Sequence, residues 1–203
     1  MKLLRVSIVI FLMKVLISNA RSTLRVEINE ASQFINLPKI QKITREYFEN
    51  DLAVQNLLDY LQSEEFTSAW NVFMTSSEVE DILQWIKYHG VNTDKEIELL
   101  SHEIEKIKPI NSQNESIQTF SIKSFSDELK SLINFKSLNA TIDELLKDEN
   151  DFAHLYLILT VSRRSLENLF QREEILRSIE SLKRLGVDME ALKAELYEIL
   201  RWE

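Results

Sequence analysis

The chain has 203 residues, a formal net charge of −9, two glycines and no cysteine. The missing cysteine excludes disulfides, thiolate nucleophiles and cysteine zinc sites, and two glycines are too few for a glycine-rich phosphate loop. The acidic balance argues against nucleic acid as a partner, because cationic side chains supply most non-specific nucleic-acid affinity.

The first twenty residues have the pattern of a cleaved signal peptide. Lys2 and Arg5 precede an apolar run, and Ser18 and Ala20 place small residues where a signal peptidase cleaves. We therefore expect residues 1–20 to be removed and the protein to be exported; a retained signal-anchor is the alternative. Cleavage would remove three cationic side chains and move the formal net charge from −9 to −12.

The remaining chain is predicted to be all-α, with about ten to twelve short helices. Apolar residues recur at helical spacing, and few glycines or prolines are available for the turns of a sheet. Breaks between helices are expected near residues 36, 50, 62, 76, 91, 109–123, 134, 149, 163, 172 and 187. The segment 152–161 is apolar on nearly every side, and we expect a helix buried at the centre of the protein there.

Both glycines belong to the same short turn. Gly90 is followed by Val and Asn, and Gly186 by Val and Asp. Each glycine is predicted to end a helix in the left-handed conformation. Asn92 or Thr93 is then expected to cap the helix after Gly90, and Asp188 the helix after Gly186.

The repeated turn indicates a duplication. Residues 78–104 match residues 174–200 at an offset of 96, and Ile35 and Asn36 match Ile133 and Asn134 at an offset of 98. We predict two tandem repeats of five to six helices, over residues 21–109 and 124–203, joined by a polar linker at 110–123. The two repeats are expected to form one helical shell around an apolar interior. Independent helices that share a cap motif are the alternative.

The bulky apolar residues of these helices are the candidates to line a ligand cavity, although such stripes are also typical of a solid core. The candidates are Leu57, Leu61, Phe66, Trp70, Phe73, Val79, Leu83, Ile86, Phe152, Leu155, Leu159, Leu166, Leu169, Ile175, Ile179 and Leu182.

No motif predicts catalysis, a cofactor or a metal. In "HEIEK", beginning at His102, Lys106 stands where a zinc-protease helix needs its second His. The clustered carboxylates fall mostly at helix starts, where the helix dipole favours negative charge. Asn114 and Asn139 are candidate N-glycosylation sites, and Asn139 is the weaker of the two because it falls in a predicted helix.

Four segments resemble the insect allergen-related repeat family, the microvillar-allergen-like proteins of insect midgut. They are "NDLAVQNLLDYLQSEEF" (50–66), "SSEVEDILQWIKYHGVNTDKEIELLSHEI" (76–104), "FSDELKSLI" (125–133) and "IESLKRLGVDMEALKAELYEIL" (179–200). The resemblance implies a helical shell that encloses fatty acids or phospholipids, and secretion into the midgut lumen or association with its microvilli. It carries over no catalytic residue. We therefore expect a secreted, non-enzymatic lipid-binding protein; a helical protein-interaction module of the gut surface with no ligand cavity is the alternative.

Overall fold

The fold is known from a computed structural model, which describes residues 23–95, 97–98 and 122–202. The predicted signal peptide, Asn114 and His102 lie outside these residues, as does most of the predicted linker. The helices of the described part are α2 (Thr23–Ser32), α3 (Leu37–Asn50), α4 (Leu52–Leu61), α5 (Glu64–Met74), α6 (Ser77–Tyr88), α8 (Ile122–Ser131), α9 (Phe135–Leu145), α10 (Asp151–Val161), α11 (Arg163–Leu169), α12 (Glu173–Arg184) and α13 (Met189–Leu200). Within the described residues, the only pairing of extended backbone is an isolated bridge between Ile35 and Ile133. The all-α prediction is confirmed.

The helix boundaries follow local sequence signals. Asn36, Asp51, Ser63, Asn134, Asn150 and Asp188 each accept a hydrogen bond from a backbone N–H in the first turn of the following helix. Such caps satisfy donors that have no partner within the helix. The predicted breaks at residues 36, 50, 62, 76 and 134 each fall at the start or the end of a helix. One boundary differs from the prediction, because α8 already begins at Ile122, inside the expected linker.

The two glycine turns have the predicted geometry. Gly90 has φ of 82° and Gly186 has φ of 87°. The N–H of Val91 donates to the carbonyl of Ile86 at 3.3 Å, and the N–H of Val187 donates to that of Leu182 at 2.9 Å. Both turns are Schellman motifs, in which the residue after the glycine folds back onto the last helical turn. Asn92 and Asp188 then cap the next helices through hydrogen bonds to Lys95 N and Ala191 N.

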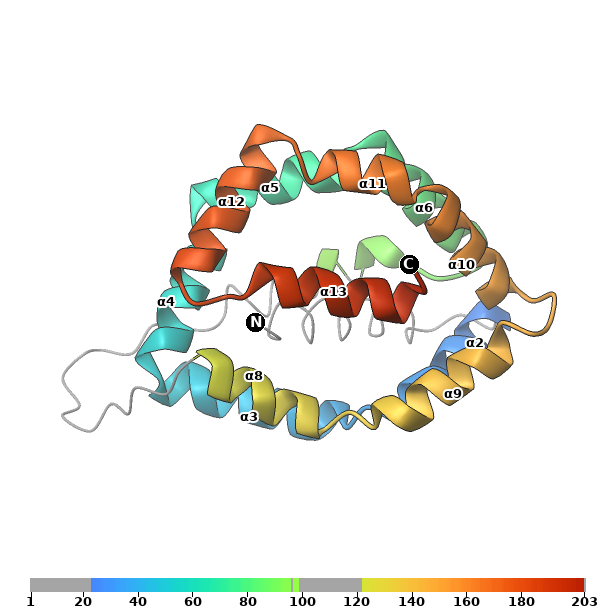
Figure 1. The fold of residues 1–203 in the computed structure, drawn as a ribbon, viewed down its shortest axis with the longest axis horizontal. Coiled ribbons are helices and arrows are strands. Elements are labelled where there is room, and N and C mark those ends of the chain that lie inside the picture. The colour runs from blue at the N-terminus through green and yellow to red at the C-terminus, as the bar shows by residue number, and fades with distance from the viewer. Residues whose placement is uncertain (1–22, 96, 99–121, 203) are drawn as a thin grey trace.

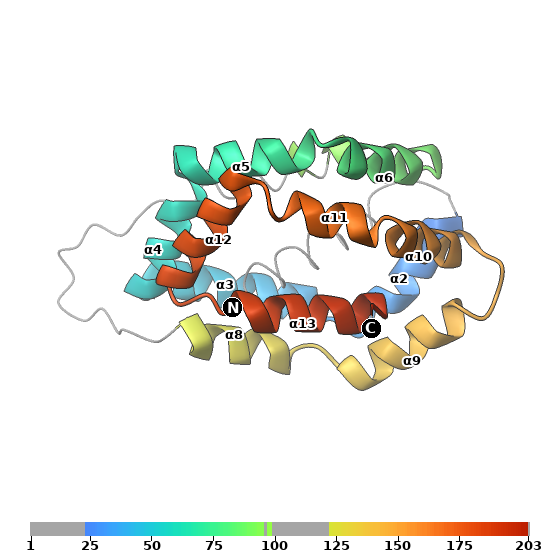
Figure 2. The same ribbon diagram turned by 45° about the horizontal axis from the view of Figure 1, so that its top comes forward.

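The helices of the two halves pack reciprocally. Helix α2 contacts α9, and α3 contacts α8; in the same way α5 contacts α12, and α6 contacts α11. By the sequence offsets, α8 and α9 are the counterparts of α2 and α3, and α11 and α12 are those of α5 and α6. Helix α2 therefore lies beside the counterpart of α3, and α5 beside the counterpart of α6. Figure 1 shows these pairs around the periphery of the molecule, with α13 crossing in front, and Figure 2 shows α5 and α12 still side by side after rotation. This arrangement is consistent with two repeats that form one unit, as an internal two-fold relation would produce.

Two apolar clusters form the core. The first apolar cluster contains Leu24, Ile28, Ala31, Val79, Ile82, Ile86, Val91, Leu138, Ile142, Phe152, Leu155, Leu166, Leu169, Ile175 and Trp202. The second apolar cluster contains Ile35, Ile40, Ile43, Phe48, Val54, Leu57, Leu58, Ile122, Phe125, Leu129, Leu182, Val187 and Leu192. Each cluster draws on both halves of the chain, so neither half completes a core alone.

Helix α10 is not buried at the centre, and this prediction is wrong. It lies at the periphery in Figure 1, where Leu157 is 60% exposed and Val161 is 71% exposed. Its inner face, with Phe152 and Leu155, is buried. A sequence that is apolar all round does not reveal which face meets the core, so the packing of the neighbouring helices decided the exposure.

Candidate functional site

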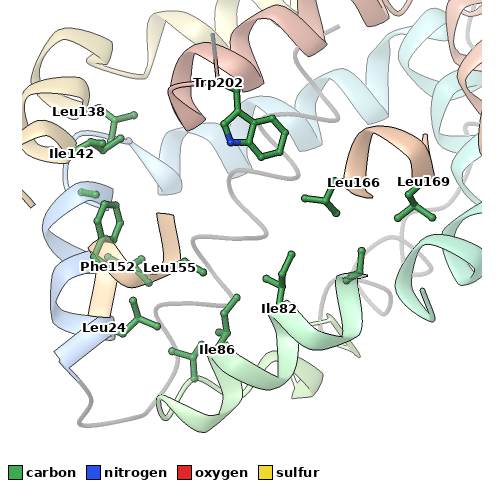
Figure 3. Close-up of a cluster of buried hydrophobic side chains, with 14 of the residues drawn as sticks. Leu24, Ile82, Ile86, Leu138, Ile142, Phe152, Leu155, Leu166, Leu169 and Trp202 are labelled. Atoms are coloured by element: carbon green, nitrogen blue, oxygen red, sulfur yellow. The ribbon is translucent and has the colours of Figure 1, made fainter. Parts of the chain in front are cut away.

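The candidate site is the first apolar cluster, the group of buried side chains that would have to hold an apolar ligand. Its buried side chains come from α2, α6, α9, α10, α11 and α12 and from Trp202 beyond α13. Figure 3 shows the labelled side chains extending from different helices toward one region, with Leu24 and Ile86 on one side and Leu138 and Trp202 on the other. A surface of this composition suits an apolar ligand, because it offers little to a polar one.

Most of the predicted cavity residues belong to this cluster. Val79, Ile86, Phe152, Leu155, Leu166, Leu169 and Ile175 are buried in it, and Trp70, Phe73, Leu83, Leu159 and Ile179 pack against it half-buried. Leu57, Leu61 and Leu182 lie instead in the second apolar cluster. The structure therefore brings together twelve of the sixteen candidates, from α5, α6, α10, α11 and α12. Leu57, Leu61 and Leu182 are separated from them, and Phe66 joins the group through its stacking on Trp70.

The aromatic candidates of α5 form a continuous row. Phe66 stacks on Trp70 with ring centroids 6.3 Å apart, Trp70 on Phe73 at 6.0 Å, and Phe73 on Phe170 at 6.0 Å. Stacking at these separations is favourable for aromatic pairs. The row joins α5 to the end of α11, and its Trp70 and Phe73 rings pack against the first apolar cluster.

Several residues of the cluster were missed by sequence reasoning. Leu24, Ile28 and Ala31 lie on one face of α2, and Leu138 and Ile142 lie one turn apart on α9. Their spacing of three or four residues is a usable signal for an amphipathic helix. Trp202 offered no such signal, because it follows the last helical turn and its burial depends on the turn at Arg201.

One carboxyl group reaches into the cluster. Glu27 on α2 is 8% exposed, and its Oε2 accepts a hydrogen bond from the backbone N of Phe152 at 3.0 Å. Burial raises the pKa of Glu27, and the nearby Asp151 and Glu30 raise it further, whereas the Phe152 hydrogen bond lowers it. The first turn of α10 is thus satisfied from two sides, by Glu27 and by the cap residue Asn150. This arrangement is structural, since it fixes α2 against α10.

The C-terminal helix is held in place by polar contacts at its last turns. Tyr156 on α10 donates to the carbonyl of Ile199 at 2.9 Å, and burial raises the pKa of Tyr156 to about 12. Tyr197 donates to Glu167, which also accepts from Arg163 Nε at 3.1 Å. The hydrogen bond from Tyr197 and that from Arg163 hold the pKa of Glu167 below its usual range. These bonds connect α13 to α10 and α11.

Other sequence candidates stand apart from this interior. Asn139 lies within α9, half-buried, and its Oδ1 is buried with no hydrogen-bond donor among the described residues, so the site is a poor acceptor for a glycan. An open depression of about 500 Å3 lies on the exposed side of α5, and it is lined mostly by polar side chains: Gln62, Glu64, Thr67, Ser68, Asn71, Val72 and Thr75. In the described part of the chain, no helix has the length and apolar content needed to cross a membrane.

The fold and this cluster together define an all-helical protein whose two halves both contribute side chains to the same apolar core. Residues 23–193 match the family described as insect allergen related repeat, nitrile-specifier detoxification, and the chain belongs to this insect allergen-related family. It is also similar to Protein G12 of Anopheles gambiae, with 26% identity over 162 residues, covering 77% of each chain. The family resemblance of the sequence is therefore confirmed.

Proposed function

We propose that this protein is a secreted, non-enzymatic carrier that holds the acyl chains of fatty acids or phospholipids against its first apolar cluster. The observation that carries the proposal is the convergence of buried apolar side chains from both halves of the chain on one interior, seen for Leu24, Ile86 and Leu166 in Figure 3. Transfer of an acyl chain from water to such a surface is favourable by about 0.8 kcal/mol for each buried CH2 group. The site of action in this proposal is the insect midgut, either its lumen or its microvillar surface.

Lipid binding is tested on the full chain, expressed in cultured insect cells and recovered from the medium. Solvent extraction of the purified protein should release acyl lipids detectable by mass spectrometry, and the extracted protein should rebind a fluorescent fatty acid. N-terminal sequencing of the same material should begin after Ala20. A folded protein that carries no lipid and rebinds none would refute the proposal.

Two leucines of α10 provide a matched pair of variants. Leu159 is half-buried against the first apolar cluster, whereas Leu157 is 60% exposed. Leu159→Gln places a polar group in the apolar cluster and should weaken fatty-acid binding by about tenfold, which corresponds to about 1.4 kcal/mol. Leu157→Gln changes the outer face and should leave binding unchanged.

The alternative function is a helical protein-interaction module of the gut surface. It is favoured by the outer face of α10, where Leu157 and Val161 lie one turn apart and are both exposed. Exposed apolar pairs of this kind occur at interaction sites, although single ones are ordinary. Under this alternative, Leu157→Gln should abolish retention of the protein on midgut brush-border membranes, and Leu159→Gln should not. The same pair of variants therefore distinguishes the two functions.

A further inference from the structure

The last turn of the chain repeats the geometry of the two glycine turns with a different residue. Arg201 N donates to Glu198 O at 3.3 Å, and Trp202 N donates to Tyr197 O at 2.8 Å. Gly186 and Val187 make the same two bonds after α12. Arg201, however, holds a left-handed φ of 56° without being glycine. This conformation costs a residue with a side chain about 1–2 kcal/mol.

Two contacts compensate for the strained turn and orient it. Arg201 Nη2 donates to Asp143 Oδ1 on α9 at 2.6 Å. The Trp202 ring meets the Tyr197 ring edge-on, with centroids 5.5 Å apart. The turn is thereby fixed between α9 and α13 with the indole directed inward. Strained backbone that is held by specific contacts is typical of functional positions.

The indole of Trp202 brings an unpaired donor to the apolar interior. Trp202 is 6% exposed, and its Nε1 is buried with no hydrogen-bond acceptor among the described residues. Figure 3 shows the ring extending from the end of α13 into the interior that Leu155 and Ile82 also face. Leaving a buried N–H without an acceptor costs about 1–3 kcal/mol. An acceptor supplied by a ligand would recover that energy.

Cationic groups beside the indole favour a negatively charged acceptor. The guanidinium carbon of Arg163 lies 5.8 Å from the centroid of the Trp202 ring and 5.0 Å from that of Tyr197, and Lys193 Nζ lies 5.2 Å from the Tyr197 centroid. Glu167 is the carboxylate that faces this group, and it accepts from both Arg163 and Tyr197. Arg163 is thus the cation in contact with the Trp202 ring, and Lys193 adds a positive charge at the adjoining Tyr197 ring, while Arg201 pairs with Asp143 beside them.

We propose that the indole N–H of Trp202 is the head-group anchor of the site, donating a hydrogen bond to the acyl oxygen of the ligand, with a free long-chain carboxylate preferred over its neutral ester. The inference rests on the proposed acyl-chain function and adds a specificity determinant to it. Trp202 lies beyond residues 23–193, the part of the chain that matches the family.

The test measures binding of three probes of equal chain length to the lipid-free full chain: hexadecane, methyl hexadecanoate and hexadecanoate. Hexadecanoate should bind most tightly and hexadecane least. Trp202→Phe keeps the aromatic ring and removes the donor, so it should weaken hexadecanoate binding by about tenfold, as expected for loss of one hydrogen bond to a charged group. Its affinity for hexadecane should not change. Tyr88→Phe, at a position 87% exposed, is the control that removes a polar group from an aromatic ring elsewhere.

A second measurement does not depend on the folding of the Trp202 variant. The chain has three tryptophans, so its nitrogen–proton spectrum contains three indole signals, and Trp70→Phe and Trp85→Phe identify that of Trp202 by elimination. This signal should move downfield with hexadecanoate and stay in place with hexadecane. If hexadecane and hexadecanoate bind equally and the signal does not move, the anchor is refuted and the carrier function stands. If no probe binds, both are refuted.

Discussion

Ile35 and Ile133, which match at an offset of 98 residues in the sequence, pair with each other in an antiparallel bridge. Asn36 N donates to Leu132 O at 3.2 Å, and Asn134 N donates to Phe34 O at 3.0 Å. The contact is therefore self-complementary, because each partner offers the same groups to its counterpart. The bridge brings the starts of α3 and α9 next to each other. It also lies between the two apolar clusters, since Ile133 packs against both of them.

The paired caps beside this bridge should contribute equally to stability. Asn36 Oδ1 accepts from Lys39 N at 3.2 Å, and Asn134 Oδ1 accepts from Ser137 N at 3.1 Å. Asn36→Ala and Asn134→Ala should each lower the free energy of unfolding by about 1 kcal/mol, measured by urea denaturation. Ser162→Ala is the control, because Ser162 precedes α11 without a side-chain cap bond, and its effect should stay within about 0.5 kcal/mol.

The two glycines should resist replacement because of their backbone conformation. Gly90→Val and Gly186→Val should each destabilise the protein by about 1 kcal/mol or more, since a side chain is strained at these positive φ values. At Gly186 an added Cβ meets only Ile122 at 3.9 Å, so steric overlap contributes little. Gly186→Asn should therefore cost less than Gly186→Val, because Asn tolerates the left-handed region. Equal melting temperatures for Gly186→Val and the parent would contradict the assignment.

Two leucines of α10 should respond unequally to truncation. Leu155 is 7% exposed in the first apolar cluster, whereas Leu157 is 60% exposed. Leu155→Ala should lower the free energy of unfolding by about 2–5 kcal/mol, and Leu157→Ala by about 0.5 kcal/mol or less. Thermal denaturation of both variants measures the difference. A similar loss in both would mean that α10 is buried on both faces.

Glu27 should make stability depend on pH. Its pKa is raised in the folded protein, so the folded state favours the protonated carboxyl group. This contribution is complete below the pKa of the unfolded chain, near 4.5, and is lost as pH rises through the raised value. Glu27→Gln remains neutral and keeps an acceptor for Phe152 N. The stability of Glu27→Gln relative to the parent should therefore increase between pH 4 and pH 7, measured by urea denaturation at each pH. A constant difference over this range would argue against the raised pKa.

Tyr156 should hold the last turn of α13. Removing its hydroxyl in Tyr156→Phe deprives the Ile199 carbonyl of its donor and should cost about 1–3 kcal/mol. Amide hydrogen exchange should accelerate in α13 more than in α3, which belongs to the second apolar cluster and makes no hydrogen bond with Tyr156 among those of the described residues. Tyr88→Phe is the matched control, since Tyr88 is 87% exposed and should tolerate the change. Unchanged exchange in α13 would show that the other contacts suffice.

Local sequence determined the all-α class, the positions of the helix breaks, and the two glycine turns with their caps, because caps and Schellman turns involve residues only a few positions apart. At α6 the local signal is misleading: Ser77 and Glu80 have the spacing of a capping box, yet the helix already includes Ser77, and the preceding Ser76 donates to Phe73 O. Tertiary packing alone decided which side of α10 faces water, how Ile35 meets Ile133, that Glu27 bonds Phe152, and that Trp202 is buried. Each of these depends on residues brought together from distant parts of the chain, and no periodicity within a single helix encodes such contacts.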